Sequence, residues 1–113
     1  MLWVARIGGS GIDSLRGVTV DQSGAVYAIG DFSSSPVTVY NADGTTFKSF
    51  PSVASSDVIV VSYSSVNGAA RWVSNIAGAG TDTGVGIAFD RYSTSGIYVT
   101  GTYNNNLTCC LLY

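Results

Sequence analysis

The side chains of this chain that are able to do acid, base or metal chemistry are nearly all aspartates. All seven acidic residues are Asp, and the sequence contains no His. Without an imidazole, neither a Ser-His-Asp triad nor a Cys-His pair can form, and carboxylate-pair catalysis would depend on Asp alone. We therefore expect a protein that is not an enzyme and that uses no cofactor and no metal.

Four of the aspartates form two pairs with one spacing: Asp13 and Asp82, and likewise Asp21 and Asp90, are separated by 69 residues. An Asp beside a turn commonly accepts hydrogen bonds from backbone N–H groups. This predicts a structural, turn-capping role, with a ligand or metal role as the alternative. Asp43, in the segment NADG, is expected to form a turn, because the distal Glu and alternating ligands of a calcium loop are absent.

The two cysteines, Cys109 and Cys110, are neighbours in the sequence. In a strand, neighbouring side chains point to opposite faces, and a disulfide between neighbours is strained. Two thiols without further Cys or His do not complete a zinc site. We expect both to be small buried apolar side chains.

The composition does not indicate a nucleic-acid or membrane partner. The net charge is −2 and the five cations are dispersed, so no basic stripe is present to neutralise phosphates or to bind anionic lipid. No apolar run approaches the roughly 18 to 20 residues that span a bilayer. Met1 is not followed by the basic and apolar regions of a signal peptide, although a precursor could have lost one.

The elements that must position these side chains are strands. The chain of 113 residues contains 14 Gly and no Glu. Val, Ile, Tyr, Thr and Phe, the residues that fit a pleated surface, dominate its short apolar runs. The sequence therefore predicts a single all-β domain.

An internal repeat organises these strands. Aligning Trp3 with Trp72 also matches Gly9 with Gly78. Further along it matches four pairs of identical or similar residues: Asp13 with Asp82, Gly17 with Gly86, Val18 with Ile87 and Val20 with Phe89. Beyond an insertion in the second copy, VYAIGDF at 26–32 matches IYVTGTY at 97–103. Such a match of Trp, Gly and Asp in one order indicates a structural repeat.

The repeat unit contains four predicted strands, which we label a to d. They are residues 17–21 (a), 26–32 (b), 57–64 (c) and 70–78 (d), and residues 3–8 repeat strand d. The long segment 33–56 lies between b and c, and its part PVTVYNADGTTFKSF predicts an added hairpin with a turn at residues 41–44. Four antiparallel strands followed by a Gly-rich crossing are typical of a β-propeller blade.

The residues of the repeat resemble a known family. The pattern W-x-x-x-I-x-G-x-G-x-D, then G-[VI]-x-[VF]-D, then [VI]-Y-x-x-G-x-[FY], is similar to the SBBP-type β-propeller repeat and covers most of residues 3–32 and 57–103. The segment 33–56 is longer than in that family. The resemblance implies a binding or structural propeller, often secreted or at a cell surface, with no common active site.

The strand order d-abcd-abc predicts how blades are completed. One blade spans about 17–77, and a second, about 84–113, lacks an outer strand that residues 2–8 of a neighbouring chain would supply. Because blade faces are apolar and repeats need neighbours, we expect a closed homo-oligomeric ring, with a trimer of six blades favoured over a dimer or tetramer. The alternative is a piece of a longer propeller.

The connections d-to-a and b-to-c lie at one end of a propeller, and the longest loop here is among them. Candidate ligand residues at that end are Asp13, Asp31, Tyr40, Asp82 and Tyr103. Arg16 is the candidate residue of an axial channel, and Trp3 and Trp72 are expected to be packing anchors between blades. The favoured function is a binding module for a glycan or a peptide. A purely structural assembly protein is the second hypothesis, and an enzyme the least favoured.

Overall fold

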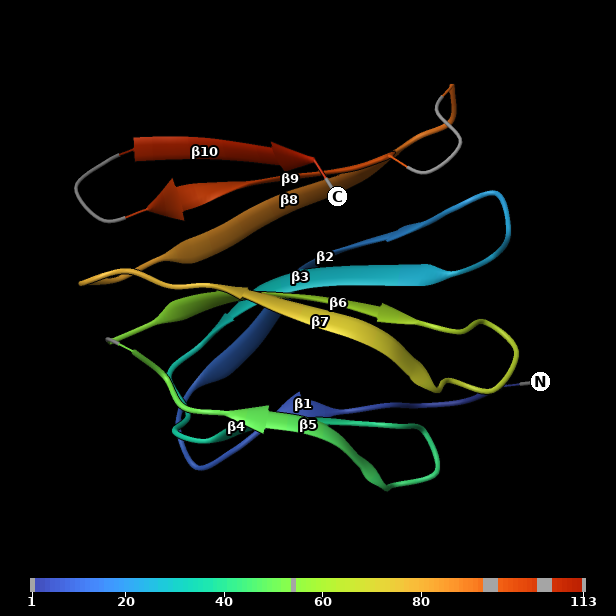
Figure 1. The fold of residues 1–113 in the computed structure, drawn as a ribbon, viewed down its shortest axis with the longest axis horizontal. Coiled ribbons are helices and arrows are strands. Elements are labelled where there is room, and N and C mark those ends of the chain that lie inside the picture. Colours follow the sequence, from blue (N-terminus) through green and yellow to red (C-terminus); the bar gives the residue numbers. More distant parts are fainter. Residues whose placement is uncertain (1, 54, 93–95, 104–106, 113) are drawn as a thin grey trace.

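The computed structural model describes residues 2–53, 55–92, 96–103 and 107–112, the last segment by its backbone alone. Ten strands and no helix occur in these residues, and the strands form three antiparallel sheets. The all-β prediction is therefore confirmed. Figure 1 shows the three sheets edge-on, stacked one above another.

The middle sheet is the four-stranded unit that the repeat predicts. Its strands are β2 (Asp13–Val20), β3 (Val26–Phe32), β6 (Asp57–Tyr63) and β7 (Ala70–Ile76), paired antiparallel in the order β2-β3-β6-β7. They correspond to a, b, c and d. Strand a is longer than expected, because it begins at Asp13 and passes a bulge between Leu15 and Gly17.

The upper sheet repeats this order with three strands. β8 (Thr83–Asp90), β9 (Gly96–Tyr103) and β10 (Leu107–Leu112) pair antiparallel in the order β8-β9-β10, as predicted for the second a, b and c. β8 also has a bulge, between Gly84 and Gly86, at the position equivalent to the bulge of β2. The repeat in the sequence is therefore a repeat of strand irregularities as well.

The lower sheet consists of the N-terminal segment and the predicted hairpin. β4 (Val37–Tyr40) and β5 (Thr46–Phe50) pair antiparallel, and Gly44, with φ of 89°, completes the turn between them. β1 is only Ile7–Gly8, much shorter than the predicted strand 3–8, and it pairs with β4. The N-terminal strand thus has a partner within its own chain, which the sequence did not predict.

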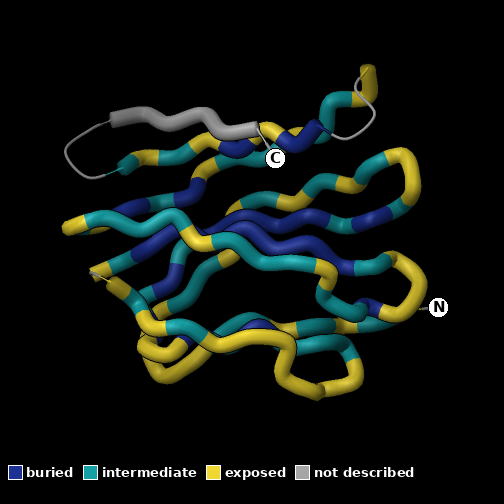
Figure 2. Tube along the Cα trace, in the orientation of Figure 1, coloured by how far each residue is buried: buried dark blue, intermediate teal, exposed yellow. Residues whose placement is uncertain are grey.

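Two apolar cores hold the stack together, one on each side of the middle sheet (Figure 2). The upper core joins β3 and β6 to β9 through five buried side chains: Tyr27, Ile29, Val60, Ile97 and Val99. The lower core joins the same two strands to β4 through another five: Phe32, Val37, Val39, Ile59 and Val61. β6 is buried along its whole length, because successive residues serve opposite cores.

Gly30 and Gly101, at the same position of strand b in the two repeats, allow these sheets to form. A Cβ atom on Gly30 would collide with the Ser14 carbonyl oxygen, and one on Gly101 with the Thr83 carbonyl oxygen. Both oxygens belong to strand a just before its bulge. The Gly of the repeat motif is therefore required by the close approach of two backbones.

Among the residues that the structure describes, no helix is long and apolar enough to cross a bilayer.

Candidate binding face

Asp13 is the first residue of β2, where the crossing from β1 ends, and its carboxylate accepts three hydrogen bonds. Its Oδ2 atom accepts hydrogen bonds from the Gly9 N–H at 3.0 Å and from the Ser34 hydroxyl at 2.5 Å. Its Oδ1 atom accepts one from the Ser34 N–H at 3.2 Å. These contacts tie the crossing to the start of the long b-to-c segment, the geometry of a turn-capping carboxylate.

Asp82, the equivalent residue in the second repeat, is fully buried. Its backbone N–H donates to the Ser56 carbonyl at 2.9 Å, and the Ser56 hydroxyl donates to the Asp82 carbonyl at 3.1 Å. The second crossing is thus fastened to the end of the b-to-c segment as the first is to its start. A ligand would reach the Asp82 carboxylate only if this crossing opened.

Asp31 and Arg16, predicted for two different sites, form an ion pair with each other. The Arg16 Nε–H donates to Asp31 Oδ2 at 2.6 Å, and Nη2 lies 3.4 Å from Oδ1. The hydrogen bond and the charge of Asp31 raise the pKa of Arg16 above its ordinary value. Because Arg16 is about half exposed and Asp31 only 12% exposed, the guanidinium group is the accessible partner.

Tyr103 packs on the second crossing. A Cβ atom on Gly78 would meet the Tyr103 ring at 2.5 to 2.7 Å, so the absence of a side chain at residue 78 makes room for the ring. The cavity beside it, lined by Ile29, Val58 and Val99 among others, measures only about 20 Å³. That space holds at most one water, so no ligand fits between the two upper sheets at this point.

Tyr40 does not lie with the other four candidates, so that part of the prediction is wrong. β4 runs away from the crossings, and Tyr40, its last residue, lies at the turn into β5, close to the turn between β6 and β7. The Arg6 guanidinium stacks over the Tyr40 ring at 4.0 Å from its centroid. Because β4 leads away from the crossings, the turn of the hairpin lies at the other end of the molecule. The length of the segment 33–56 does not show at which end each of its residues lies.

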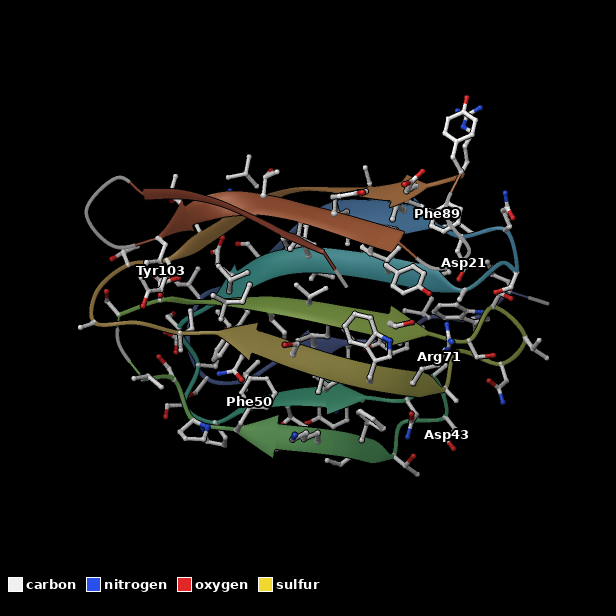
Figure 3. The ribbon with its side chains drawn as sticks, turned by 45° about the horizontal axis from the view of Figure 1, so that its top comes forward. Asp21, Asp43, Phe50, Arg71, Phe89 and Tyr103 are labelled. Atoms are coloured by element: carbon white, nitrogen blue, oxygen red, sulfur yellow. The ribbon has the colours of Figure 1, made fainter. Side chains whose placement is uncertain are left out.

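The opposite end of the molecule holds a polar cluster that the sequence did not indicate as a site (Figure 3). Asp21 Oδ1 accepts hydrogen bonds from the N–H groups of Ser23 and Ala25 and from the Ser23 hydroxyl, and Oδ2 accepts one from the Tyr27 hydroxyl at 2.8 Å. Arg71 Nη1 lies 3.3 Å from the same hydroxyl. Burial raises the pKa of Asp21, but these hydrogen bonds outweigh it, so the pKa lies below its ordinary value.

Asp57 is not among the residues that the sequence singled out. It is fully buried at the start of β6, and its Oδ2 atom accepts a hydrogen bond from the Val53 N–H at 2.6 Å. Its Oδ1 atom has no hydrogen-bond partner among the described residues. No three potential metal ligands of the His, Cys, Asp and Glu types lie together in the described part of the chain.

The two tryptophans, predicted to be packing anchors between blades, pack against the two apolar cores. Trp3 packs against Tyr63 with ring centroids 5.9 Å apart, and its indole N–H donates to the Ser65 carbonyl at 3.0 Å. Trp72 packs against Tyr27, also at 5.9 Å, beside the upper core. Both are partly buried: Trp3 packs against the lower core from the N-terminal segment, and Trp72 packs against the upper core from β7.

Comparisons with protein-family models, with curated proteins and with solved structures found no significant match to this chain. What the molecule does must therefore be argued from its own geometry. The four candidate residues at the crossing end each contact other parts of the chain, namely Gly9 and Ser34, Arg16, Ser56 and Gly78: Asp13, Asp31, Asp82 and Tyr103.

Proposed function

We propose that this chain is a non-catalytic β-propeller module of the SBBP type whose function is to assemble with further copies into a ring. The observation that carries this proposal is the repeated sheet order. β8-β9-β10 reproduces β2-β3-β6, bulge and all, and is stacked face to face on the middle sheet. Stacking of like sheets in one direction is the construction principle of propellers.

Stacked units with apolar faces are stabilised only by further neighbours. Large apolar side chains are exposed on β2 and on the N-terminal segment, among them Leu2, Val4, Leu15, Val18 and Val20. A ring buries such surfaces without leaving a free end. Six blades from three copies is the favoured arrangement, and a longer chain that supplies the neighbouring blades itself is the alternative.

A second role, binding of a glycan or a peptide, is supported by one observation. At the crossing end, the partly exposed ring of Tyr103 and the accessible guanidinium group of Arg16 lie on successive sheets. Exposed aromatic rings and charged donors are both common elements of recognition surfaces for polar ligands. Because the carboxylates of this end are already hydrogen-bonded, we rank this role after assembly.

The mass in solution tests the main proposal. Multi-angle light scattering at micromolar concentration should give about three times 11.7 kDa, or roughly 35 kDa. A stable dimer or tetramer would retain the ring and change its number of blades. A clean monomer would contradict the proposal.

A glycan array and a peptide library, both probed with the assembled protein, test the second role. Binding that is lost in Tyr103→Ala and kept in Tyr92→Ala, an exposed tyrosine of the opposite end, would support it. Absence of binding by an intact ring would leave assembly as the function.

A further inference from the structure

We infer that one specific surface of this molecule receives the upper sheet of a second copy: the free edge of β1 pairs with β10 of that copy, with Ile7 opposite Thr108. This inference rests on the proposed ring and specifies its interface residue by residue.

The pairing of β7 with β6 shows which edge an outer strand uses. In the turn between β2 and β3 the Asp21 N–H donates to the Ala25 carbonyl at 3.0 Å, so the backbone groups of these two residues point toward the opposite strand. Hydrogen-bonded and non-hydrogen-bonded pairs alternate along antiparallel strands. This alternation continues through the register of β3 and β6. It shows that the backbone groups of Trp72, Ser74 and Ile76, which alternate along β7, point toward β6. The hydrogen bond from Ser64 N–H to the Ala69 carbonyl, in the next turn, gives the same assignment.

The same edge can be identified in residues 3–8, the segment that ends in β1. The residues equivalent to Trp72, Ser74 and Ile76 are Trp3, Ala5 and Ile7, and both sets face the sheet above. The bond to β4, however, is accepted by Arg6, since the Tyr40 N–H donates to the Arg6 carbonyl at 3.1 Å. β4 therefore occupies the outer edge of β1. The inner edge, by which β7 binds β6, has no strand beside it in the described residues.

The underside of β2, next to that free edge, is largely exposed. Ile87 and Phe89 of β8 pack on the upper core, because the middle sheet lies beneath them. Their equivalents Val18 and Val20 are 67% and 52% exposed. Beneath Val18 an open depression of about 420 Å³ extends from Leu15 to Ala28. The described residues thus lack a cover at the place where a preceding blade would supply one.

On the outer face of the upper sheet, β9 is more exposed than its equivalent β3 is in the middle sheet. Tyr27 of β3 is 7% exposed under Trp72 and the sheet above, whereas its equivalent Tyr98 is 40% exposed. β10 is also an edge strand of its sheet. One molecule therefore presents two unpaired edges. One is the inner edge of β1, an outer strand, and the other is the outer edge of β10, the last of the three inner strands of the upper sheet. A second copy fits each surface, since β6 and β7 already show the resulting pair within the chain.

The register follows from the same equivalence. Val61 pairs with Ala28, and Leu111 pairs with Val99, the equivalent of Ala28, so β10 residues correspond to β6 residues 50 positions earlier. Val58, which pairs with Ile76, thus corresponds to Thr108, which is placed opposite Ile7. In this register Arg6 lies opposite Cys109 in a non-hydrogen-bonded pair, with Cα atoms about 4.5 Å apart.

Cys109, a native residue of β10, makes the register testable by disulfide formation. Arg6→Cys should form an intermolecular disulfide with Cys109 under mild oxidation, because the expected Cα separation is within disulfide range. On a non-reducing denaturing gel the protein should migrate as covalent oligomers up to the number of chains in the ring. The cross-link cannot form within one chain, because β1 and β10 belong to sheets at opposite ends of the stack (Figure 1).

Two variants serve as matched controls. Val4→Cys replaces a side chain that is 79% exposed and that lies diagonal to Cys109, about 7 to 8 Å away, beyond disulfide range. It should give no cross-link, and Arg6→Cys combined with Cys109→Ser should give none either. Equal cross-linking by Val4→Cys, or none by Arg6→Cys in a protein that light scattering shows to be oligomeric, would overturn the register and leave the ring. A monomer would overturn both.

Discussion

At the scale of single residues, the aspartates of this chain hold turns together. Asp13 and Asp21 each accept three or more hydrogen bonds from nearby backbone and hydroxyl groups. Their recurrence at one spacing was enough to predict this role, because turn chemistry is local. The Asp21–Tyr27–Arg71 cluster was not predicted, since its members come from three different strands or turns.

Replacing Asp21 tests this role. Asp21→Ala should lower the free energy of unfolding by roughly 1 to 3 kcal/mol, because the N–H groups of Ser23 and Ala25 and the Tyr27 hydroxyl lose their acceptor. Urea denaturation measures the change. Asp90→Ala is the matched control: for Asp90 the contact found is with the Tyr92 N–H at 2.9 Å, and a smaller loss is expected. Equal losses would contradict the role of the Tyr27 contact.

The same residue should contribute to acid sensitivity. The pKa of Asp21 is lower in the folded protein than its ordinary value of 3.8. Its stabilising effect is therefore complete above that pH and is lost as the pH falls through the folded-state pKa. Chemical denaturation in steps from pH 5 downward should show a decline that is shallower in Asp21→Ala. Parallel pH profiles for the two proteins would count against this prediction.

Tyr63 gives the opposite dependence. Its side chain is 5% exposed, its hydroxyl has no partner among the described residues, and burial raises its pKa to about 12. Unfolding returns the pKa to about 10, so stability is complete below pH 10 and falls as the pH rises toward 12, by roughly 2 kcal/mol. Tyr63→Phe should remove this decline and should not reduce stability at neutral pH. An unchanged alkaline decline in Tyr63→Phe would assign it to another group.

At the scale of elements, the strand order was predictable and the edges were not. Turn signals such as Asn67-Gly68, whose Gly has φ of 66°, set the chain direction at each hairpin. They carry no information on which edge of β1 the inserted hairpin would take, because both edges offer the same backbone groups. The sequence therefore predicted the hairpin correctly and missed its pairing with β1, and with it the position of Tyr40.

The glycine of strand b is the element-scale test of the repeat. Gly30→Ala should destabilise the protein by several kcal/mol or prevent folding, because its Cβ atom would meet backbone atoms of Ser14 and Leu15. Backbone atoms, unlike a side chain, cannot avoid the collision by adopting another rotamer. Gly8→Ala, where the nearest contact is the Asp13 carboxylate at 3.5 Å, is a strand control that should cost about 1 kcal/mol or less. Thermal melts compare the two. A mild effect of Gly30→Ala would show that strands a and b can separate at the bulge.

At the scale of the whole molecule, exposed apolar surface is what distinguishes the open stack from a closed ring. Val18 is the sharpest probe of it, because a side chain that is 67% exposed tolerates a charge in a monomer. In the ring the Val18 side chain would be covered as Ile87 is. A Lys without a partner at this buried position would destabilise the assembly far more than a Lys on the surface of a monomer destabilises the fold. Val18→Lys should therefore fold normally and have a mass in solution near 11.7 kDa, whereas the unchanged protein should have a mass near 35 kDa, about three times larger.

Val66→Lys, at a site that is 74% exposed in the turn between β6 and β7, should keep the full assembly. Analytical ultracentrifugation of the three proteins decides the question: dissociation by both lysines would indicate a charge effect alone, and dissociation by neither would place the interface away from the underside of β2.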